Sequence, residues 1–258
     1  MQIKKLFIAL SIVLPLHMQG QNFLIKDAPE VIESYVNQFN REDNELYKQD
    51  IPNCGASDFL RKNIPFFECP DKELEKTYYF RWWTYRKHIK KTPDGFVITE
   101  FLPDVPWAGK YNTISCAANH HFYEGRWLRN AEILSDYASF WFSGSGNPRL
   151  YSFGAADAIY NYYLIHNDKM LLADLYPKLK DNFAKWEEEK RDSTGMFWQV
   201  DDRDGMEMSV SGHLSEGGRG YRPTINSYMY GEAVALAKIA SIVDRDMEAR
   251  TYQKKADK

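Results

Sequence analysis

The stretch that decides the fold is LADLYPKLKDNFAKW, residues 172–186, in which large apolar side chains recur every three or four positions. That spacing places them on one side of an α-helix, because the helix repeats every 3.6 residues. The same rhythm runs through residues 127–141 and 229–243, and residues 153–166 carry a further apolar face. Each stretch is therefore predicted to be an amphipathic helix with one buried stripe, and Trp127 is expected in the core.

Turn sequences separate these helices, at residues 144–148, at 167–168, at 193–195 and before Pro223. Clusters of Gly, Asn, Asp, Ser and Pro of this kind end or cap helices. Strand-like sequence is confined to residues 95–102 and 196–200. Long helices joined by turns pack as helical hairpins, so the predicted fold class is all-α.

The composition is that of a globular protein. The chain has 258 residues, of which 44% are hydrophobic and 27% charged, and this balance does not suit a disordered chain. A formal net charge of −3 gives no electrostatic reason to expect a nucleic-acid partner. Aromatic residues reach 15%, enough to supply both core volume and flat surfaces at the rim of a cleft. Of three cysteines, Cys54 and Cys69 are the closest pair for a disulfide.

Residues 1–21 have the order of a secretory signal, with Lys4 and Lys5 before a short apolar run and small or polar residues around Gly20. The run is too short for a permanent transmembrane helix, although an uncleaved anchor is the alternative interpretation. We therefore expect a periplasmic or secreted protein with no stable membrane insertion after the signal is cleaved.

Two regions are predicted after the signal. Residues 22–70 contain several prolines and are interpreted as an N-terminal extension, and residues 71–258 as a helical domain. The final residues, 253–258, are polar and fall inside a helical pattern that has no cap signal. From this we expect the sequence to be the N-terminal part of its domain, as in a fragment or a truncated gene product.

The densest cluster of charge is WQVDDRDGMEMS, residues 198–209, where Trp198 and two methionines lie among the charged side chains. The charged residues are Asp201, Asp202, Arg203, Asp204 and Glu207. Apolar neighbours desolvate a carboxyl group and raise its pKa, as a general acid near neutral pH requires. A calcium loop is the alternative, but the spacing of an EF-hand is not met, so no metal is predicted.

A second cluster, residues 217–232, joins a glycine-rich loop to the start of a helix. Its candidate binding residues are Arg222, Asn226, Tyr228 and Tyr230. These side chains would present donors, acceptors and rings at a helix N-terminus, which suits sugar hydroxyls. The alternative is an ordinary helix cap with buried tyrosines.

Together the two clusters resemble the active-site region of (α/α)6 glycoside hydrolases, the group of trehalases, glycoside hydrolase family 63 and mannosylglycerate-hydrolase-like enzymes. The first cluster matches the element G-[WM]-[DE]-x-S in Gly205-Met206-Glu207-Met208-Ser209. The second matches a helix start of the form P-x-x-N-x-x-x-Y in Pro223, Asn226 and Tyr230. The resemblance covers about the last two-thirds of the chain and implies an (α/α)6 toroid, incomplete at the C-terminus of this sequence.

The resemblance also implies a mechanism. The acidic residue of the first element acts as general acid, which assigns that role to Glu207. The family usually has aspartate there, so Asp204 is kept as a substitute, and the general base is expected on a later helix, beyond Lys258. Enzymes of this group invert configuration, with two carboxyl groups about 6.5–9.5 Å apart holding the sugar and a water between them. No cofactor is implied.

The expected partner is a carbohydrate. In the aromatic loop 101–109, Trp107 is the candidate for stacking on a sugar ring. The other candidate substrate-binding residues are Trp198, Arg203, Arg222, Asn226, Tyr228 and Tyr230. Two other functions stay open: a toroid-fold polysaccharide lyase, which would abstract a proton with Tyr228, Tyr230 or His213, and an inactive relative that only binds carbohydrate.

Overall fold

The computed structural model describes residues 28–205 and 218–258. Within them the chain forms nine α-helices, and four short strands form two antiparallel ribbons. The helices are α1 (Ala28–Glu42), α2 (Ala56–Asn63), α3 (Lys72–Lys87), α4 (Ser115–Gly125), α5 (Glu132–Phe142), α6 (Ala155–His166), α7 (Lys169–Lys190), α8 (Pro223–Ile242) and α9 (Asp246–Ala256). The ribbons pair β1 (Ile89–Thr92) with β2 (Gly95–Ile98), and β3 (Trp198–Val200) with β4 (Arg219–Tyr221).

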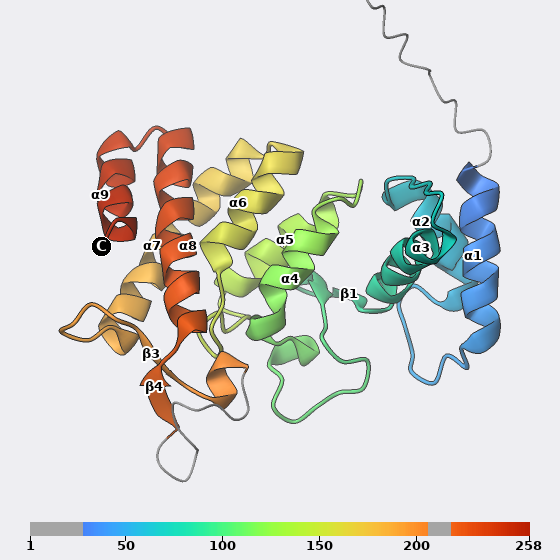
Figure 1. Cartoon of the computed structure of the whole chain (residues 1–258), viewed down its shortest axis with the longest axis horizontal. Coiled ribbons are helices and arrows are strands. Elements are labelled where there is room, and N and C mark those ends of the chain that lie inside the picture. Colours follow the sequence, from blue (N-terminus) through green and yellow to red (C-terminus); the bar gives the residue numbers. More distant parts are fainter. Residues whose placement is uncertain (1–27, 206–217) are drawn as a thin grey trace, which may run out of the picture.

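The helices after α3 form consecutive hairpins in two layers (Figure 1). In one layer α6 contacts both α4 and α8, whereas in the other α5 contacts α7, and α9 packs along α8. Phe122 of α4 stacks on Tyr137 of α5, with ring centroids 5.2 Å apart, which joins the two helices of the first hairpin. This alternation of inner and outer helices is that of an (α/α) toroid, so the predicted all-α toroid class is confirmed.

The longest helix, α7, forms as its sequence predicts. Asp168 precedes it and accepts a hydrogen bond from the backbone N–H of Leu171 at 2.9 Å, which caps the first turn. The side chains that recur every three or four positions are all buried: Leu172, Leu175, Leu179, Phe183 and Trp186. The apolar stripe of the sequence is therefore the face that α7 packs on the core.

Two expectations about local structure are wrong. Trp127 is 46% exposed, because α4 ends at Gly125 and α5 begins only at Glu132, so the tryptophan lies in the turn between them. There its ring packs against the guanidinium of Arg126, 5.2 Å away. Strand-like sequence is predicted only at residues 95–102 and 196–200, but the basic residues 90 and 91 also lie in a strand, β1, whose pairing with β2 determines their conformation.

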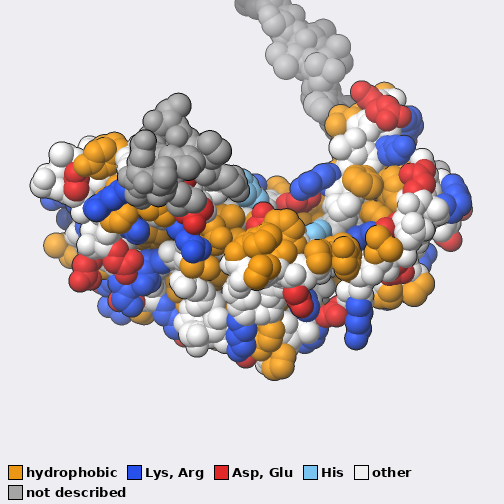
Figure 2. Space-filling view, turned by 90° about the horizontal axis from the view of Figure 1, so that it is seen from below, with side chains coloured by type: hydrophobic (Ala, Val, Ile, Leu, Met, Phe, Trp, Pro, Cys, Tyr) orange, Lys and Arg blue, Asp and Glu red, His pale blue; other side chains and the backbone are white. Residues whose placement is uncertain are grey.

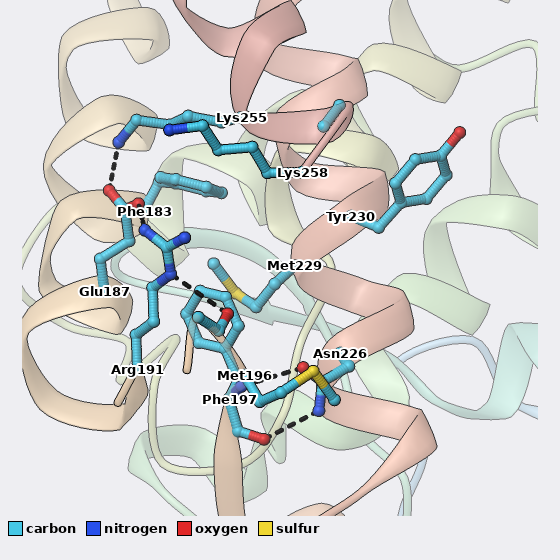
Figure 3. Close-up of a pocket in the computed structure, with 12 residues that line it drawn as sticks. Phe183, Glu187, Arg191, Met196, Phe197, Asn226, Met229, Tyr230, Lys255 and Lys258 are labelled. Carbon is cyan, nitrogen blue, oxygen red and sulfur yellow. Dashed lines mark hydrogen bonds and ion pairs between the residues drawn. The ribbon is translucent and has the colours of Figure 1, made fainter. Parts of the chain in front are cut away.

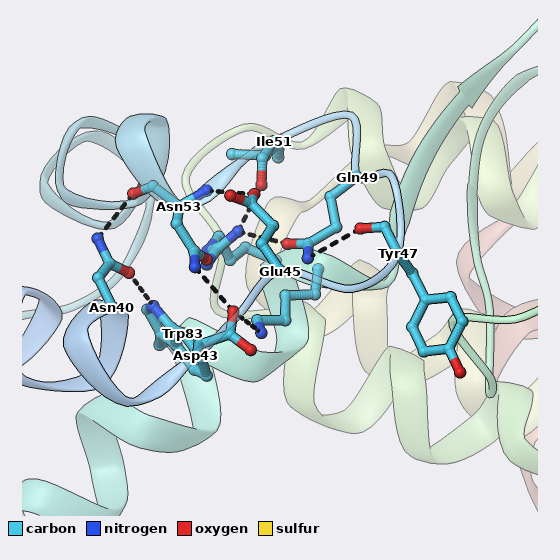
Figure 4. A network of polar contacts seen from close by, with 10 residues as sticks. Asn40, Asp43, Glu45, Tyr47, Gln49, Ile51, Asn53 and Trp83 are labelled. Carbon is cyan, nitrogen blue, oxygen red and sulfur yellow. Dashed lines mark hydrogen bonds and ion pairs between the residues drawn. The ribbon is translucent and has the colours of Figure 1, made fainter.

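An N-terminal unit of α1, α2 and α3 packs beside the hairpins. A network of polar contacts fastens the segment 43–53 to α3 (Figure 4). At its centre the fully buried Arg86 of α3 donates to the carbonyl of Ile51 at 2.5 Å and to Oε1 of Gln49 at 2.9 Å. Asn53 accepts from the same guanidinium and donates to Asp43 at 2.7 Å. The hydrogen bonds of the buried Arg86 guanidinium thus hold segment 43–53 in place, although most of this segment forms no helix or strand.

Cys54 and Cys69 do not form a disulfide with each other. None of the helices in residues 28–205 and 218–258 combines the length and hydrophobicity that a membrane crossing demands. The predicted signal peptide lies outside the described residues, and the boundary predicted at residue 71 stays a prediction.

Candidate functional site

The loops that precede α4, α6 and α8 enclose a cleft of about 610 Å³ at the N-terminal ends of these helices. Seen from the end where the loops lie, hydrophobic side chains gather across the middle of the surface (Figure 2). The lining residues are Glu100, Phe101, Pro106, Trp107, Ile114, Cys116, Leu150, Tyr151, Asp202, Arg203 and Gly205. A cleft of this size, with aromatic walls and a few charged groups, suits a small organic ligand.

Hydrogen bonds tie the three loops together beneath the cleft. Ser115, the first residue of α4, accepts a bond from the backbone N–H of Tyr151 at 3.1 Å. The backbone N–H of Ser152 donates to the carbonyl of Arg203 at 2.8 Å. The Ser152 hydroxyl also donates to Oδ1 of Asp204, at 2.5 Å. The buried Ser152 therefore fixes the segment before α6 to the acidic segment before α8.

Asp204 is the most unusual carboxyl group at this site. It is only 6% exposed, and its Oδ2 has no hydrogen-bond partner among the described residues. Burial raises the pKa of Asp204 above its ordinary value, although the hydrogen bonds from Ser152 and Thr224 oppose that effect. A carboxyl group in this setting retains its proton at a higher pH than an exposed aspartate does, which is the property of a general acid.

Trp107 lies on the rim of the cleft and is 53% exposed. Its edge-to-face partner is Phe101, with ring centroids 6.0 Å apart and an interplanar angle of 87°. An exposed indole that is held by a neighbouring ring offers a flat surface to a sugar ring. Trp107 is thus placed where stacking on a cleft ligand is possible.

The loop that carries Trp107 is held by the buried side chain of Asn112. Its Nδ2 donates to the carbonyls of Phe101 and Pro103 at 2.9 and 3.0 Å, and its Oδ1 accepts from the backbone N–H of Val105 at 3.0 Å. Asn112 has a φ of 65°, in the left-handed region that asparagine tolerates better than most residues. Asn112 is not among the residues predicted for the site, and this tolerance of the left-handed region is the one sequence signal that points to it.

Arg203 and Tyr151 also line the cleft. The guanidinium of Arg203 lies 5.1 Å from the centre of the Tyr151 ring. Its Nε is 3.7 Å from the carboxylate of Asp202, which leaves the guanidinium only loosely paired. Arg203 therefore lies in the cleft wall with only this loose ion pair among the described residues, and its role in binding a ligand stays a prediction.

Glu207 and the rest of its motif, Met206, Met208 and Ser209, lie outside the described residues. The base of this segment is firmly held, because Asp201 donates its backbone N–H to the carbonyl of Gly218 at 3.1 Å. The buried Arg222 donates to the carbonyls of Gln199 and Gly218 at 3.1 and 2.8 Å and forms an ion pair with Asp201. Arg222 therefore acts as an internal clamp on the two ends of the segment.

Asn226 and Tyr230 lie around a different cavity, of about 150 Å³, between α7, α8 and α9. The Asn226 side chain bonds both backbone groups of Phe197, accepting from its N–H at 2.9 Å and donating to its carbonyl at 2.8 Å (Figure 3). Tyr230 is 61% exposed, and its ring points away from the other residues of this cavity. The geometry gives Asn226 a structural task, and the binding role of both residues stays a prediction.

Trp198 and Tyr228 have different surroundings. Cations of Lys190 and Arg219 lie over the Trp198 ring, 3.9 and 3.7 Å from its centre, so this aromatic surface already has partners. Tyr228 is half-buried near Asp204, and burial raises the pKa of its hydroxyl. The structure thus brings Trp107 and Arg203 to the cleft and Tyr228 to the neighbouring Asp204.

The stacked hairpins and the cleft at the N-terminal ends of the inner helices define a glycosidase-like protein of the six-hairpin group. Residues 110–258 match the model of the mannosylglycerate hydrolase MGH1-like glycoside hydrolase domain. Because this match covers more than half of the chain, the chain belongs to that family. The predicted resemblance is confirmed at this level.

A solved structure named "Sialidase" is similar to this protein over 89% of the chain, with a TM-score of 0.84 and 40% sequence identity. The chain spans about a fifth of that protein, since the similarity covers 21% of its length. None of the curated proteins matches the sequence. The family and the solved structure agree on a glycoside hydrolase domain.

Proposed function

We propose that the protein is an exported glycoside hydrolase that cleaves an O-glycosidic bond of an oligosaccharide or glycoside with inversion of configuration. The observation that carries the proposal is the cleft itself, which is lined by the exposed indole of Trp107 and by Arg203, with the buried carboxyl of Asp204 next to Arg203 in the chain. Apolar walls and a carboxyl of raised pKa are what protonation of a glycosidic oxygen requires.

In this mechanism Glu207 is the general acid that protonates the leaving oxygen. It follows Gly205, a residue of the cleft wall, by two positions, and two residues of chain span at most about 7 Å. Asp204 is the alternative acid. The general base, which activates the attacking water, is proposed to lie outside this sequence, as the resemblance implies.

The substrate would be held mainly by Trp107 and Arg203. The indole of Trp107 covers the apolar face of a sugar ring, and the guanidinium of Arg203 donates to its hydroxyl or carboxyl oxygens. The names of the family and of the similar structure make mannosylglycerate and sialylated glycans the first compounds to assay.

Export is a separate part of the proposal and rests on residues 1–21 alone. Its test is N-terminal sequencing of the protein from periplasmic and culture fractions. Cleavage near Gly20 or Gln21 supports it, and an intact N-terminus in the cytoplasm contradicts it.

Substitutions of the two carboxyl groups test the mechanism in the complete product of the reading frame that encodes this sequence. We expect Glu207→Gln to lower kcat on natural glycosides by about a hundredfold or more, without changing the melting temperature. Aryl glycosides with an acidic leaving group need no protonation and should still be cleaved. If Asp204→Asn, and not Glu207→Gln, loses activity on natural glycosides but still cleaves these aryl glycosides, then Asp204 is the general acid.

The products distinguish the remaining functions. An inverting hydrolase releases the anomer opposite to that of its substrate, which NMR detects in the first minutes of reaction. A lyase forms a carbon–carbon double bond that absorbs in the ultraviolet and tolerates Glu207→Gln. Binding of sugar without turnover, in both wild type and variant, would identify an inactive relative.

A further inference from the structure

A second polar pocket lies between α3 and α4, next to the cleft. Its volume is about 150 Å³, and it is lined by side chains of α3, of the residues after β2 and of α4. Glu100 lines both this pocket and the cleft. On α4, Cys116 of the cleft and His121 of the pocket are five residues apart, about 7–8 Å along the helix axis. A ligand that extends from the cleft across Glu100 therefore reaches this pocket.

The pocket offers hydrogen bonds without a net positive charge. Burial lowers the pKa of His88, and lowers that of His121 to about 3, so both imidazoles are neutral at neutral pH. A neutral imidazole has one donor and one acceptor nitrogen, which matches a hydroxyl group. Nδ1 of His88 is buried and has no hydrogen-bond partner among the described residues. His121 Nδ1 lies 3.2 Å from the hydroxyl of Tyr137.

The charged groups at the edge of the pocket disfavour an anionic ligand. Arg81 is held by two hydrogen bonds to the carboxylate of Glu124, from Nε at 3.2 Å and from Nη2 at 2.5 Å. Its charge is thereby largely neutralised, while Glu100 adds a carboxyl group at the junction with the cleft. A phosphate or carboxylate would find little positive charge here, whereas an uncharged polyol would find both donors and acceptors.

We propose that this pocket binds a further, uncharged sugar unit of the substrate, with the glycan crossing Glu100 between the cleft and α3. The inference rests on the proposed function and extends it, because it makes the substrate an oligosaccharide. The α3 wall of the pocket precedes residues 110–258, the part that matches the glycoside hydrolase family. The N-terminal helices would thus determine the length of glycan that the protein prefers.

The test measures binding to a printed array of neutral and acidic glycans of one to six units, followed by titration calorimetry with the best neutral series. The complete product of the reading frame is used. The pocket is filled by Thr84→Phe, and the matched control is Thr77→Phe, an exposed threonine on the same helix that also donates to a backbone carbonyl. His88→Phe is the second variant, because it keeps the ring and removes the polar nitrogens.

We expect the wild type to bind longer neutral glycans at least tenfold more tightly than monosaccharides or disaccharides. Thr84→Phe and His88→Phe should each lose about tenfold on the longer glycans and retain the affinity for short ones, while Thr77→Phe behaves as wild type. Equal affinity for short and long glycans, or a preference for an acidic unit that survives Arg81→Ala, would overturn the inference and leave the proposed function standing. If neither the wild type nor Trp107→Ala binds any glycan, that result would contradict the proposed function itself.

Discussion

The carboxyl of Glu232 is the group whose surroundings differ most from those of an ordinary glutamate. It lies on α8, is fully buried, and accepts a hydrogen bond at 3.0 Å from the backbone N–H of Asp157 in the first turn of α6. Its Oε2 has no partner among the described residues. Burial raises the pKa of Glu232 to about 8. The residue thus joins two inner helices and keeps a proton at neutral pH.

This proton makes the stability of the protein depend on pH. Because the folded pKa of about 8 exceeds the ordinary value of 4.5, the stabilisation is complete below pH 4.5 and is lost as the pH rises toward 8. We expect the free energy of unfolding, from urea titrations, to fall across this range by roughly a few kcal/mol. In Glu232→Gln the fall should be much smaller, whereas the exposed control Glu33→Gln should retain it. An equally steep fall in both variants would exclude Glu232 as its source.

In the loop before α4, the side chain of Asn112 makes hydrogen bonds to the backbone that strand pairing would make in a sheet. Asn112→Ala removes three hydrogen bonds and places an alanine at a φ of 65°. We expect it to lower the free energy of unfolding by about 3 kcal/mol and to speed proteolytic cleavage within 101–109. Asn112→Gly also loses the bonds but tolerates the backbone conformation, so it should cost about 1 kcal/mol less. Equal losses would show that the backbone conformation contributes nothing.

The helices could be predicted from sequence because a buried helix face needs an apolar residue every three or four positions. In α7 each residue of this apolar stripe is buried. Trp127 fits the spacing of apolar residues in the following helix but lies in the turn before it. The spacing of apolar residues alone does not show where a helix begins. Strand β1 was not predicted because its sequence, which includes two basic residues, lacks the alternation of apolar and polar residues that is typical of a strand. Its conformation comes from pairing with β2.

The site was predictable only in part. A run of carboxylates beside apolar residues pointed to Asp204, and a tryptophan in a non-helical loop pointed to Trp107. Arg222 and Asn226 have the residue types of ligand-binding groups, yet both bond the backbone around β3. Sequence does not show whether a polar side chain faces a ligand or its own main chain. Which of the two a side chain does depends on tertiary contacts, such as the hydrogen bonds by which Asn112 holds its loop.

At the scale of the whole molecule, the N-terminal unit and the hairpins meet at a close contact between α3 and α4. The hydroxyl of Tyr85 on α3 donates to the carbonyl of His121 on α4 at 2.7 Å. Gly125 leaves room for it, because a Cβ at that position would lie 2.0 Å from the Tyr85 oxygen. A glycine at the end of α4 therefore allows the two parts to approach.

A double-mutant cycle tests this contact. Gly125→Ala forces the two helices apart and should cost about 2–3 kcal/mol in the free energy of unfolding, measured in urea. Tyr85→Phe loses one hydrogen bond, about 1 kcal/mol. In the double variant the contact with the hydroxyl oxygen is gone, while the ring carbon Cζ would still lie 2.9 Å from the new Cβ. The clash is therefore partly relieved, and the combined loss should fall short of the sum by about 1 kcal/mol. Strict additivity would show that the hydroxyl and the glycine are not coupled.

The pair of cations over Trp198 has a chemical consequence. Burial and the neighbouring Arg219 lower the pKa of the Lys190 amine. An unprotonated amine is the nucleophilic form, so in mildly alkaline buffer an activated ester should acylate Lys190 more readily than a lysine of ordinary pKa. A fluorophore attached there would stand beside β3 and β4, which flank the segment that contains Glu207, and its emission would follow rearrangements of the ribbon without altering any residue of the cleft.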